Sequence, residues 1–151
     1  LHYGSDVFDA AFSSSSIEHF GELADVRQSL AELCRVLKPG GIATLSTEYR
    51  VRGPAPGLPG CIMFDAHDLV AQVIGDLPWA PVDPLDCQLS AATMGTQQDN
   101  NLVLADIHRH FEEHGEMIHH KLEFSNYPQI IWRLGDTHAL TSVHLALRKN
   151  G

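Results

Sequence analysis

Residues 7–20 read VFDAAFSSSSIEHF, and this stretch decides the fold. Its first six residues form a short apolar run broken only by Asp9, which predicts a buried strand. Four serines follow, Ser13 to Ser16, and short hydroxyl side chains favour a turn because they can bond the local backbone. The stretch therefore predicts a strand that ends in a serine turn.

The residues after this turn complete a strand–helix–strand unit. Apolar residues recur at spacings of three and four over residues 22–37, which predicts a helix with one apolar face. Pro39, Gly40 and Gly41 are expected to end it, since proline cannot continue a helix and glycine allows a left-handed turn. Residues 42–47 (IATLST) then predict a second strand, apolar enough to be covered on both faces. This order is typical of a parallel βαβ unit.

The remaining chain predicts two more helices and two more strands. Residues 50–60 are rich in proline and glycine and indicate a loop, and Asp65 or Asp68 is expected to cap a helix over residues 69–77. Alternating apolar residues predict a strand at residues 82–89. A helix is expected at residues 100–114 and a final strand at residues 139–148.

Two pieces of the βαβ unit, FDAAFSSSSIEHF and LCRVLKPGG, resemble motifs of class I S-adenosylmethionine-dependent methyltransferases that act on small molecules. In that family the first motif comprises strand four and the turn after it, and the second connects the next helix to strand five. Either piece alone would be a weak signal, whereas the two at this spacing are specific. The close resemblance covers residue 5 to about residue 47.

The resemblance implies an α/β fold, part of a doubly wound, Rossmann-like sheet of order 3-2-1-4-5-7-6 with an antiparallel seventh strand. On that map the predicted strands are strands four to seven. Residues 1–151 are expected to form the C-terminal portion of a truncated methyltransferase domain, with an insertion at about residues 90–138. The family's glycine-rich turn and its acidic residue after strand two have no counterpart here, so the isolated chain is expected to be inactive.

The implied function is methyl transfer from S-adenosylmethionine to an unidentified small molecule, in the complete protein. Ligands of such sheets lie beyond the carboxyl ends of the strands. The predicted cofactor-binding residues are therefore Ser13, Ser14 and Ser15, where small side chains let a ligand approach and hydroxyls can bond it.

Predicted substrate contacts are Glu48, Tyr49 and Arg50, at the mouth of strand five. His19 is a candidate general base, since a neutral imidazole can take a proton from the methyl acceptor. The alternative is that Glu18 and His19 begin the helix and bond locally.

A rival function is a non-catalytic, methyltransferase-like module that binds a partner or dimerises. A homodimer is the expected assembly, because an edge strand at residues 7–12 would have neither the lysine nor the proline by which natural edges avoid pairing. The alternative is that the insertion at residues 90–138 folds back over this edge.

Two further groups of residues leave alternatives open. Of five histidines in residues 108–120, only His110 and His114 share a helix face, and without an H-E-x-x-H pattern no metal site is expected. Trp79, Tyr127 and Trp132 are candidates for a substrate pocket or for the core, where aromatic side chains are more common.

Composition excludes several classes of function. The formal charge of -9 and the scattered lysines and arginines argue against a nucleic-acid surface. No apolar run approaches the ~20 residues that a membrane helix needs. The three cysteines form no C-x-x-C pair, which favours a reduced, cytoplasmic setting over a disulfide framework.

Overall fold

A computed structural model describes residues 2–115 and 129–151 and divides the chain into two compact units. The first, the sheet unit, comprises Leu1–Tyr49, Ala55–Cys87 and Ser142–Gly151. The second unit comprises Arg50–Pro54 and Gln88–Thr141. The predicted insertion at about residues 90–138 falls within the second unit, and its status as an insertion stays a prediction.

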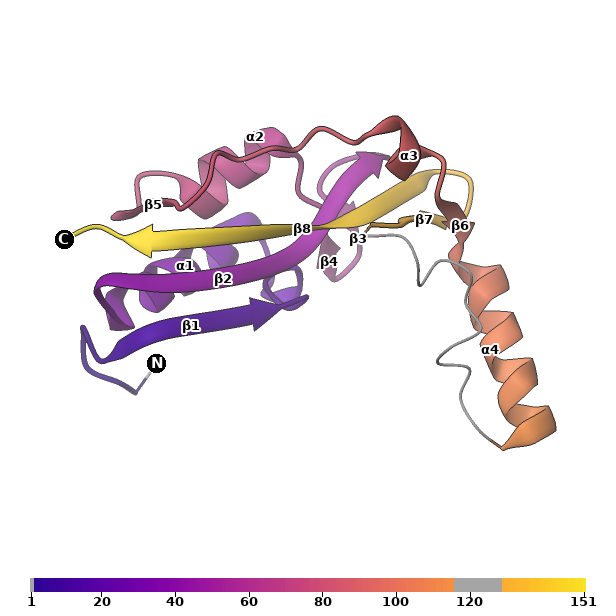
Figure 1. Ribbon diagram of the computed structural model, residues 1–151, viewed down its shortest axis with the longest axis horizontal. Coiled ribbons are helices and arrows are strands. Elements are labelled where there is room, and N and C mark those ends of the chain that lie inside the picture. The colour runs from indigo at the N-terminus through magenta and orange to yellow at the C-terminus, as the bar shows by residue number, and fades with distance from the viewer. Residues whose placement is uncertain (1, 116–128) are drawn as a thin grey trace. The chain divides into compact units, whose positions relative to one another are not determined.

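The sheet unit is built on parallel strands β1 (Phe8–Ser14) and β2 (Leu37–Arg52). Strand β8 (His138–Lys149) lies beside β2 and runs in the opposite direction (Figure 1). Strand β5 (Trp79–Pro81) pairs antiparallel with β8. The order β1-β2-β8-β5 corresponds to strands four, five, seven and six of the expected sheet, so the predicted fold class is confirmed.

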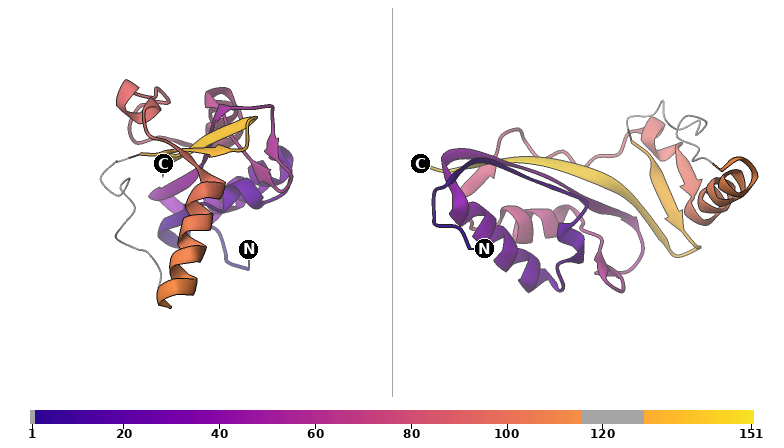
Figure 2. Two further views of the ribbon diagram at one scale, coloured as in Figure 1. Left: turned by 90° about the vertical axis from the view of Figure 1, so that its right-hand side faces the viewer. Right: turned by 90° about the horizontal axis from the view of Figure 1, so that it is seen from below.

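Helix α1 (Leu23–Val36) connects β1 to β2. It begins with a capping box between Glu22 and Asp25 and buries Val26, Leu30 and Cys34 on one face. The short helix α2 (Ala66–Asp68), capped by the Asp65 side chain as predicted, continues into the π-helical turn η2 (Leu69–Ile74). Figure 2 shows α1 and η2 on the same face of the sheet.

The core of the sheet unit lies between this face and the helices. Its buried residues are Ile17, Val26, Leu30, Cys34, Leu37, Ala43, Leu45, Ile62, Phe64, Leu69, Val73, Trp79, Leu145 and Leu147. Trp79 is thus a core residue, and its Nε1 donates a 3.2 Å hydrogen bond to the carbonyl of Val73. Thr44, between buried Ala43 and Leu45, is exposed on the other face. The expectation that β2 is covered on both faces is therefore wrong for this residue, because the strand alternates.

The PGG segment does not end α1 in the expected way. The helix ends at Val36, and the extended Leu37 already begins β2. Gly40, at φ 79°, supplies a left-handed residue at the irregular start of the β1–β2 ladder. A Cβ on Gly41 would lie 2.8 Å from the carbonyl oxygen of Lys38 and 3.1 Å from that of Asp9, so this position requires glycine for close backbone approach.

Three other boundaries differ from prediction. The prediction of a strand at residues 82–89 is wrong, because the strand found here, β5, lies just before that range. The Val82 N–H still donates to the carbonyl of Ala146 on β8. The pairing with β8 then stops because Pro84 has no N–H to donate. The helix expected to reach residue 77 ends at Ile74, where Gly75 turns left-handed at φ 49°. The loop predicted at residues 50–60 instead contains the end of β2 and strand β3 (Gly57–Leu58), which pairs with β4 (Cys61–Ile62).

In the second unit, β6 (Gln97–Asp99) pairs parallel with β7 (Ile131–Leu134). The first residues of β8 pair antiparallel with β7. Helix α3 (Ala91–Met94) precedes β6, and α4 (Asn100–His114) follows it over the predicted range. Tyr127, His119 and His120 lie outside the described residues. Within residues 2–115 and 129–151, no helix is long and apolar enough to cross a membrane.

Candidate functional site

The carboxyl end of β1 carries a serine turn that is hydrogen-bonded to β2. The backbone N–H of Ser15 donates to the carbonyl oxygen of Ser46 (3.0 Å) and to its Oγ (3.1 Å). Ser46 Oγ donates to Ser14 Oγ at 3.3 Å, and Ser13 Oγ lies 2.6 Å from Ser16 Oγ. Ser15 has φ 42°, a left-handed conformation that is uncommon outside glycine, so these bonds hold the turn in a specific shape.

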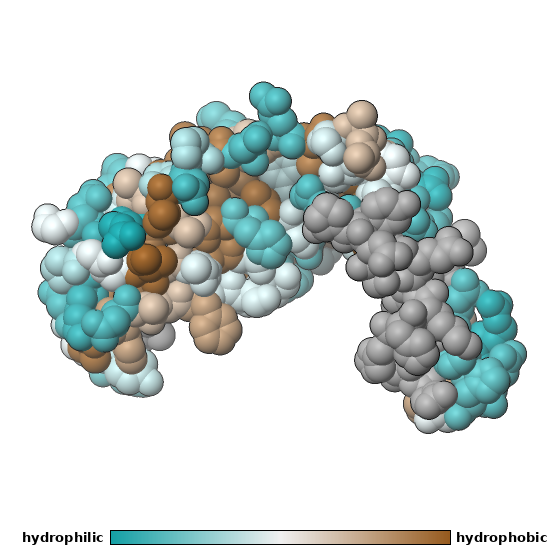
Figure 3. All heavy atoms as spheres, in the orientation of Figure 1, coloured by the Kyte–Doolittle hydropathy of each residue, from teal (hydrophilic) through white to brown (hydrophobic). Residues whose placement is uncertain are grey.

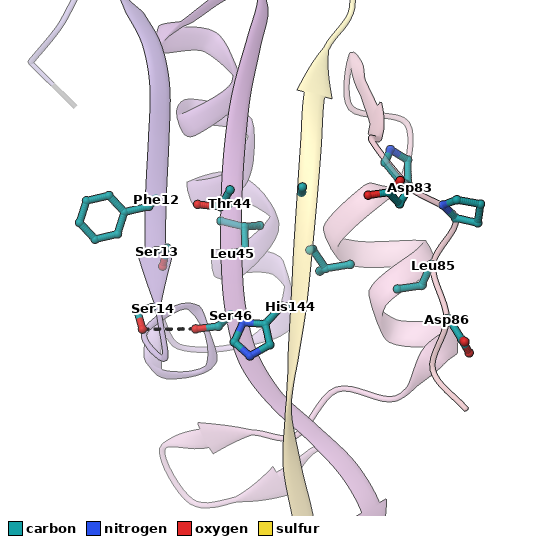
Figure 4. Close-up of a pocket in the computed structure, with 14 residues that line it drawn as sticks. Phe12, Ser13, Ser14, Thr44, Leu45, Ser46, Asp83, Leu85, Asp86 and His144 are labelled. Carbon is teal, nitrogen blue, oxygen red and sulfur yellow. Dashed lines mark hydrogen bonds between the residues drawn. The ribbon is translucent and has the colours of Figure 1, made fainter. Parts of the chain in front are cut away.

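A cavity of about 570 Å³ lies over the sheet beside this turn (Figure 4). Figure 4 shows Ser14 and Ser46 joined by a hydrogen bond, with His144 of β8 next to Ser46. The full lining is Phe12, Ser13, Ser14, Thr44, Leu45, Ser46, Pro81, Asp83, Pro84, Leu85, Asp86, His144, Leu145 and Ala146. Apolar side chains also gather on the face of the sheet unit shown in Figure 3, between polar ones.

A second cavity, of about 860 Å³, lies between the serine turn and α1. Phe12 and Phe20 border it, and Phe12 is 84% exposed. Its other lining residues are Ser13, Ser14, Ser16, Ile17, Gln28, Ser29, Leu30, Glu32 and Leu33. Hydroxyl groups and exposed aromatic rings at one opening can bond and stack on a planar polar ligand.

A buried carboxylate follows the turn. Glu18, in the 3₁₀ turn η1 (Ile17–His19), is 1% exposed, and its Oε2 accepts a 2.8 Å hydrogen bond from Thr47 Oγ1. Glu18 Oε1 is buried without a hydrogen-bond partner among the described residues, and so is Glu48 Oε2. Burial, and secondarily the charge of Glu18, raise the pKa of Glu48, while nearby His19 opposes the rise.

His19 is fixed by a contact distant in sequence. Its Nδ1 lies 2.7 Å from the carbonyl oxygen of Gly60, and since a carbonyl only accepts, Nδ1 carries a proton. Its Nε2 lies 3.9 Å from Glu18 Oε1, and the side chain is 55% exposed. The imidazole is thus held by one nitrogen, with the other facing a buried carboxylate.

Comparison with known proteins agrees with this geometry. Residues 1–45 match the family model of the methyltransferase domain. The fold matches the [4+2]-cyclase SpnF (TM-score 0.56, 18% identity, 99% of this chain and 52% of that chain). It also matches a candidate sarcosine dimethylglycine methyltransferase from Galdieria sulphuraria (TM-score 0.58, 12% identity, 99% of this chain and 56% of that one).

The chain has the class I methyltransferase fold. The fold that the sequence resemblance implies is therefore confirmed. A third structural match is a phosphoethanolamine N-methyltransferase 2 of Haemonchus contortus, solved with phosphomonomethylethanolamine and S-adenosylhomocysteine (TM-score 0.54, 14% identity, 99% of this chain and 35% of that one). No curated protein gives a significant match. The chain spans about half the length, or less, of these structures.

In this methyltransferase fold, the predicted cofactor residues are not equivalent. Ser13 and Ser14 line both cavities, whereas Ser15 lines neither and instead bonds Ser46 through its backbone. Ser16 lines the second cavity although the sequence did not single it out. All four serines lie at the predicted end of β1; a cofactor role for any of them stays a prediction.

The predicted substrate residues lie within β2, not beyond its end. The strand runs to Arg52 because pairing continues, with the Phe64 N–H donating to the Glu48 carbonyl (2.9 Å) and Tyr49 forming a bridge with Phe64. Tyr49 also packs against the core. Arg50 belongs to the second unit.

Glu18 and His19 make local contacts, with the His19 backbone N–H donating to the Ser16 carbonyl at 3.0 Å and His19 Nε2 3.9 Å from Glu18 Oε1, but their side-chain hydrogen bonds are to distant residues. Both precede α1, which begins at Leu23, and their partners Thr47 and Gly60 are 29 and 41 residues away in sequence. Thr47 and Gly60 were not predicted as partners of Glu18 and His19. Threonine and glycine are common residue types, and their positions near the turn become known only once the strands are placed.

One group in the described ranges has the spacing of a metal site, namely Asp65, His67 and Asp68. Asp65 and Asp68 already cap α2, with Asp65 accepting from the Asp68 N–H and Asp68 from the Asp65 N–H. This capping accounts for the cluster. The rings of His110 and His114 lie with centroids 4.4 Å apart at an interplanar angle of 45°, and neither residue belongs to this group.

Proposed function

We propose that the protein transfers a methyl group from S-adenosylmethionine to a small molecule. The observation that best supports this proposal is the serine turn at the carboxyl end of β1. The turn lies within residues 1–45, which match the methyltransferase domain model, and it borders a cavity beside the exposed rings of Phe12 and Phe20. A cyclase shares the fold, so the fold alone does not decide the reaction. The proposal rests on the site.

The chain's residues suit one part of the cofactor. Ser13, Ser14 and Ser16 offer hydroxyls that can bond the polar groups of an adenosine, and Phe12 and Phe20 offer rings on which a base can stack. When bound, S-adenosylmethionine supplies an electrophilic methyl group on a sulfonium. The sequence contains no G-x-G-x-G turn that would supply backbone donors to the charged end.

His19 is the proposed base. With Nδ1–H donated to Gly60, the lone pair of a neutral imidazole is at Nε2, the nitrogen available to accept a proton. An imidazolium formed there lies 3.9 Å from Glu18 Oε1, whose negative charge stabilises it. Glu48 and Tyr49, next to Thr47 on β2, are the proposed substrate contacts in the sheet unit.

We also propose that the chain dimerises, and a separate observation supports this proposal. In the described part of the chain β1 is paired on one side only, with β2. An unpaired strand edge beside exposed apolar side chains favours association with a second strand. Dimerisation would serve either an enzyme or a non-catalytic binding module.

Calorimetry with S-adenosylmethionine on the full-length protein tests the proposed function. We expect saturable binding that weakens at least about tenfold in S13A and S14A together, the effect of losing roughly 1.4 kcal/mol of contact. S5A is the matched control, because Ser5 is exposed and lines neither cavity. Absence of binding to the full-length protein would favour the non-catalytic module.

A further inference from the structure

Helix α4 carries two histidines that are one helical turn apart. His110 and His114 stand at positions i and i+4, so their side chains share one face of the helix. Their ring centroids are 4.4 Å apart, and the ring planes are inclined by 45°. His110 is partly exposed and the His114 side chain is 53% exposed, so dissolved ions can reach both rings. The two imidazoles therefore form an accessible pair.

The surroundings of this pair on α4 favour a cation. Among the described residues, neither imidazole has a hydrogen-bond partner, so their nitrogens are available to a ligand. A carboxylate lies nearby, with Glu113 Oε2 3.7 Å from His114 Nε2, and its negative charge attracts a positive ion. Arg109, next to His110 in sequence, forms an ion pair with Asp106, which balances its charge.

Two imidazoles at this spacing suit a divalent transition metal ion. Imidazole nitrogens bind Zn²⁺, Ni²⁺ and Cu²⁺, whereas Mg²⁺ and Ca²⁺ prefer oxygen ligands. Zinc–nitrogen bonds of about 2.0–2.1 Å place two nitrogens on one tetrahedral ion roughly 3.4 Å apart. Rotation of a histidine ring about χ2 is broad, so two rings with centroids 4.4 Å apart can each bring one nitrogen to that separation.

The sequence predicted no metal site at these histidines, because the H-E-x-x-H pattern is absent. The glutamate of that pattern is the base of a catalytic zinc site, whereas binding of the ion uses the two histidines at i and i+4. The three-ligand group found among the described residues is Asp65, His67 and Asp68, and its carboxylates already cap α2. An ion on α4 would have two protein ligands and complete its coordination with water, which suits reversible binding.

We propose that His110 and His114 form a two-histidine binding site for a divalent transition metal ion, with Zn²⁺ as the representative ligand. An ion bound to both rings joins consecutive turns of α4, and it can do so only while the helix is formed. Binding therefore stabilises the last turns of α4, because a ligand that binds one state alone shifts the equilibrium toward that state. The site is independent of the proposed methyl transfer, which uses residues of the sheet unit.

Titration of the untagged 151-residue chain with zinc chloride, followed by amide NMR and calorimetry, tests the site. The solution is kept at about pH 7.5, because only a neutral imidazole binds a metal. We expect saturable shifts in α4 between Ile107 and His114, and none there with magnesium chloride. H110Q and H114Q should each weaken zinc binding at least about tenfold, since a second ligand at fixed spacing raises affinity roughly 10²–10⁴-fold.

H108Q is the matched control for these variants. His108 is an exposed histidine of the same helix, but it lies two residues from His110, where side chains do not face each other. Its replacement should leave zinc binding unchanged. A second measurement reports the link between the turns: amide exchange in the last turn of α4 should slow about 100-fold at a zinc concentration about 100 times the dissociation constant, and H114Q should abolish this slowing.

Three results would overturn the proposal. Unchanged zinc affinity in H110Q or H114Q would show that the two rings do not bind one ion. An equal loss of affinity in H108Q would show binding to single histidines, which is an adventitious ion only. Shifts at Asp65, His67 and Asp68 without shifts in α4 would place the zinc at the cap of α2. Circular dichroism of each variant verifies that glutamine at these solvent-facing positions leaves the fold intact.

Discussion

Thr47 Oγ1 donates a 2.8 Å hydrogen bond to Glu18 Oε2, and both side chains are buried. The bond joins β2 to the η1 turn that precedes α1. Among the described residues it is the hydrogen bond that holds the Glu18 carboxylate, whose Oε1 has no hydrogen-bond partner there and lies 3.9 Å from His19 Nε2. The orientation of the candidate site therefore depends on this pair.

A double-mutant cycle measures this interaction. We expect T47V and E18Q to couple in the free energy of unfolding by about 0.5–3 kcal/mol, because the pair is in direct contact and buried. Urea denaturation of the two single variants and the double variant gives the value. T141V with E18Q is the control, since Thr141 is also buried but its hydroxyl bonds the Ile130 carbonyl. Equal coupling in the two cycles would refute a specific Thr47–Glu18 bond.

Stability should depend on pH through Glu48. Burial raises its pKa above the ordinary 4.5, so the unfolded chain ionises first as pH rises. Folding stability from this group is fully present below pH 4.5 and is lost as pH rises through the higher folded pKa. E48Q removes that loss. The free energy of unfolding of E48Q minus that of the parent should therefore increase from about pH 4 to about pH 8, as measured by urea denaturation at each pH.

E32Q supplies a control of opposite sign. A hydrogen bond from Arg35 lowers the pKa of Glu32 to about 2, so this carboxylate stabilises the fold above its unfolded pKa and loses the effect only as pH falls toward the lower value. E32Q should therefore be less stable than the parent over the same pH range. A flat difference for E48Q would mean that its carboxylate is hydrated in the folded protein.

The 151-residue chain alone should bind S-adenosylmethionine weakly or not at all. The serine turn offers hydroxyls, but no glycine-rich turn supplies backbone N–H groups to the charged end of the cofactor. Calorimetry on this chain provides the measurement. A sub-micromolar dissociation constant would show that other residues of the chain replace that turn.

The βαβ unit could be predicted because its signals are local. The apolar spacing of α1, the serine turn and the PGG segment each act within a few residues, and together they place β1, α1 and β2. The position of this edge strand could not be predicted correctly. Apolar residues alternate through residues 82–89, but backbone hydrogen bonding to β8 ends before Pro84, which has no N–H. Partner strands, not alternation, decide where a short edge strand lies.

The candidate site could be predicted only in part, for a similar reason. The sequence does not distinguish the four serines from one another. The strand register pairs Ser14 with Ser46, so that the Ser15 N–H bonds Ser46 and Ser15 lines neither cavity. In the sequence Glu18 is indistinguishable from an ordinary residue before a helix, and its role becomes visible only when β2 brings Thr47 to it. The one sequence signal for Glu18 was its position between the apolar Ile17 and His19. That signal does not predict burial, because the burial of Glu18 depends on contacts distant in sequence.

The chain should self-associate through the open edge of β1. Among the described residues this edge has unpaired backbone groups, and Asp9, the charge that would discourage pairing, forms an ion pair with Lys38 at 2.8 Å. Val7, directly before β1, and Phe12, within it, are exposed large apolar residues. Two such edges related by a two-fold axis would satisfy each other's hydrogen bonds and bury these side chains together. Sedimentation equilibrium at micromolar concentration should show a dimer.

Phe12 provides the specific test of this interface. F12K should raise the dimer dissociation constant at least about tenfold, because burial of a phenylalanine side chain is worth roughly 1.5–3 kcal/mol. F111K is the matched control: Phe111 is also an exposed phenylalanine, but it lies on α4 in the second unit. If F111K weakens association as much as F12K, general surface hydrophobicity is responsible, and a monomeric parent chain at micromolar concentration contradicts edge pairing altogether.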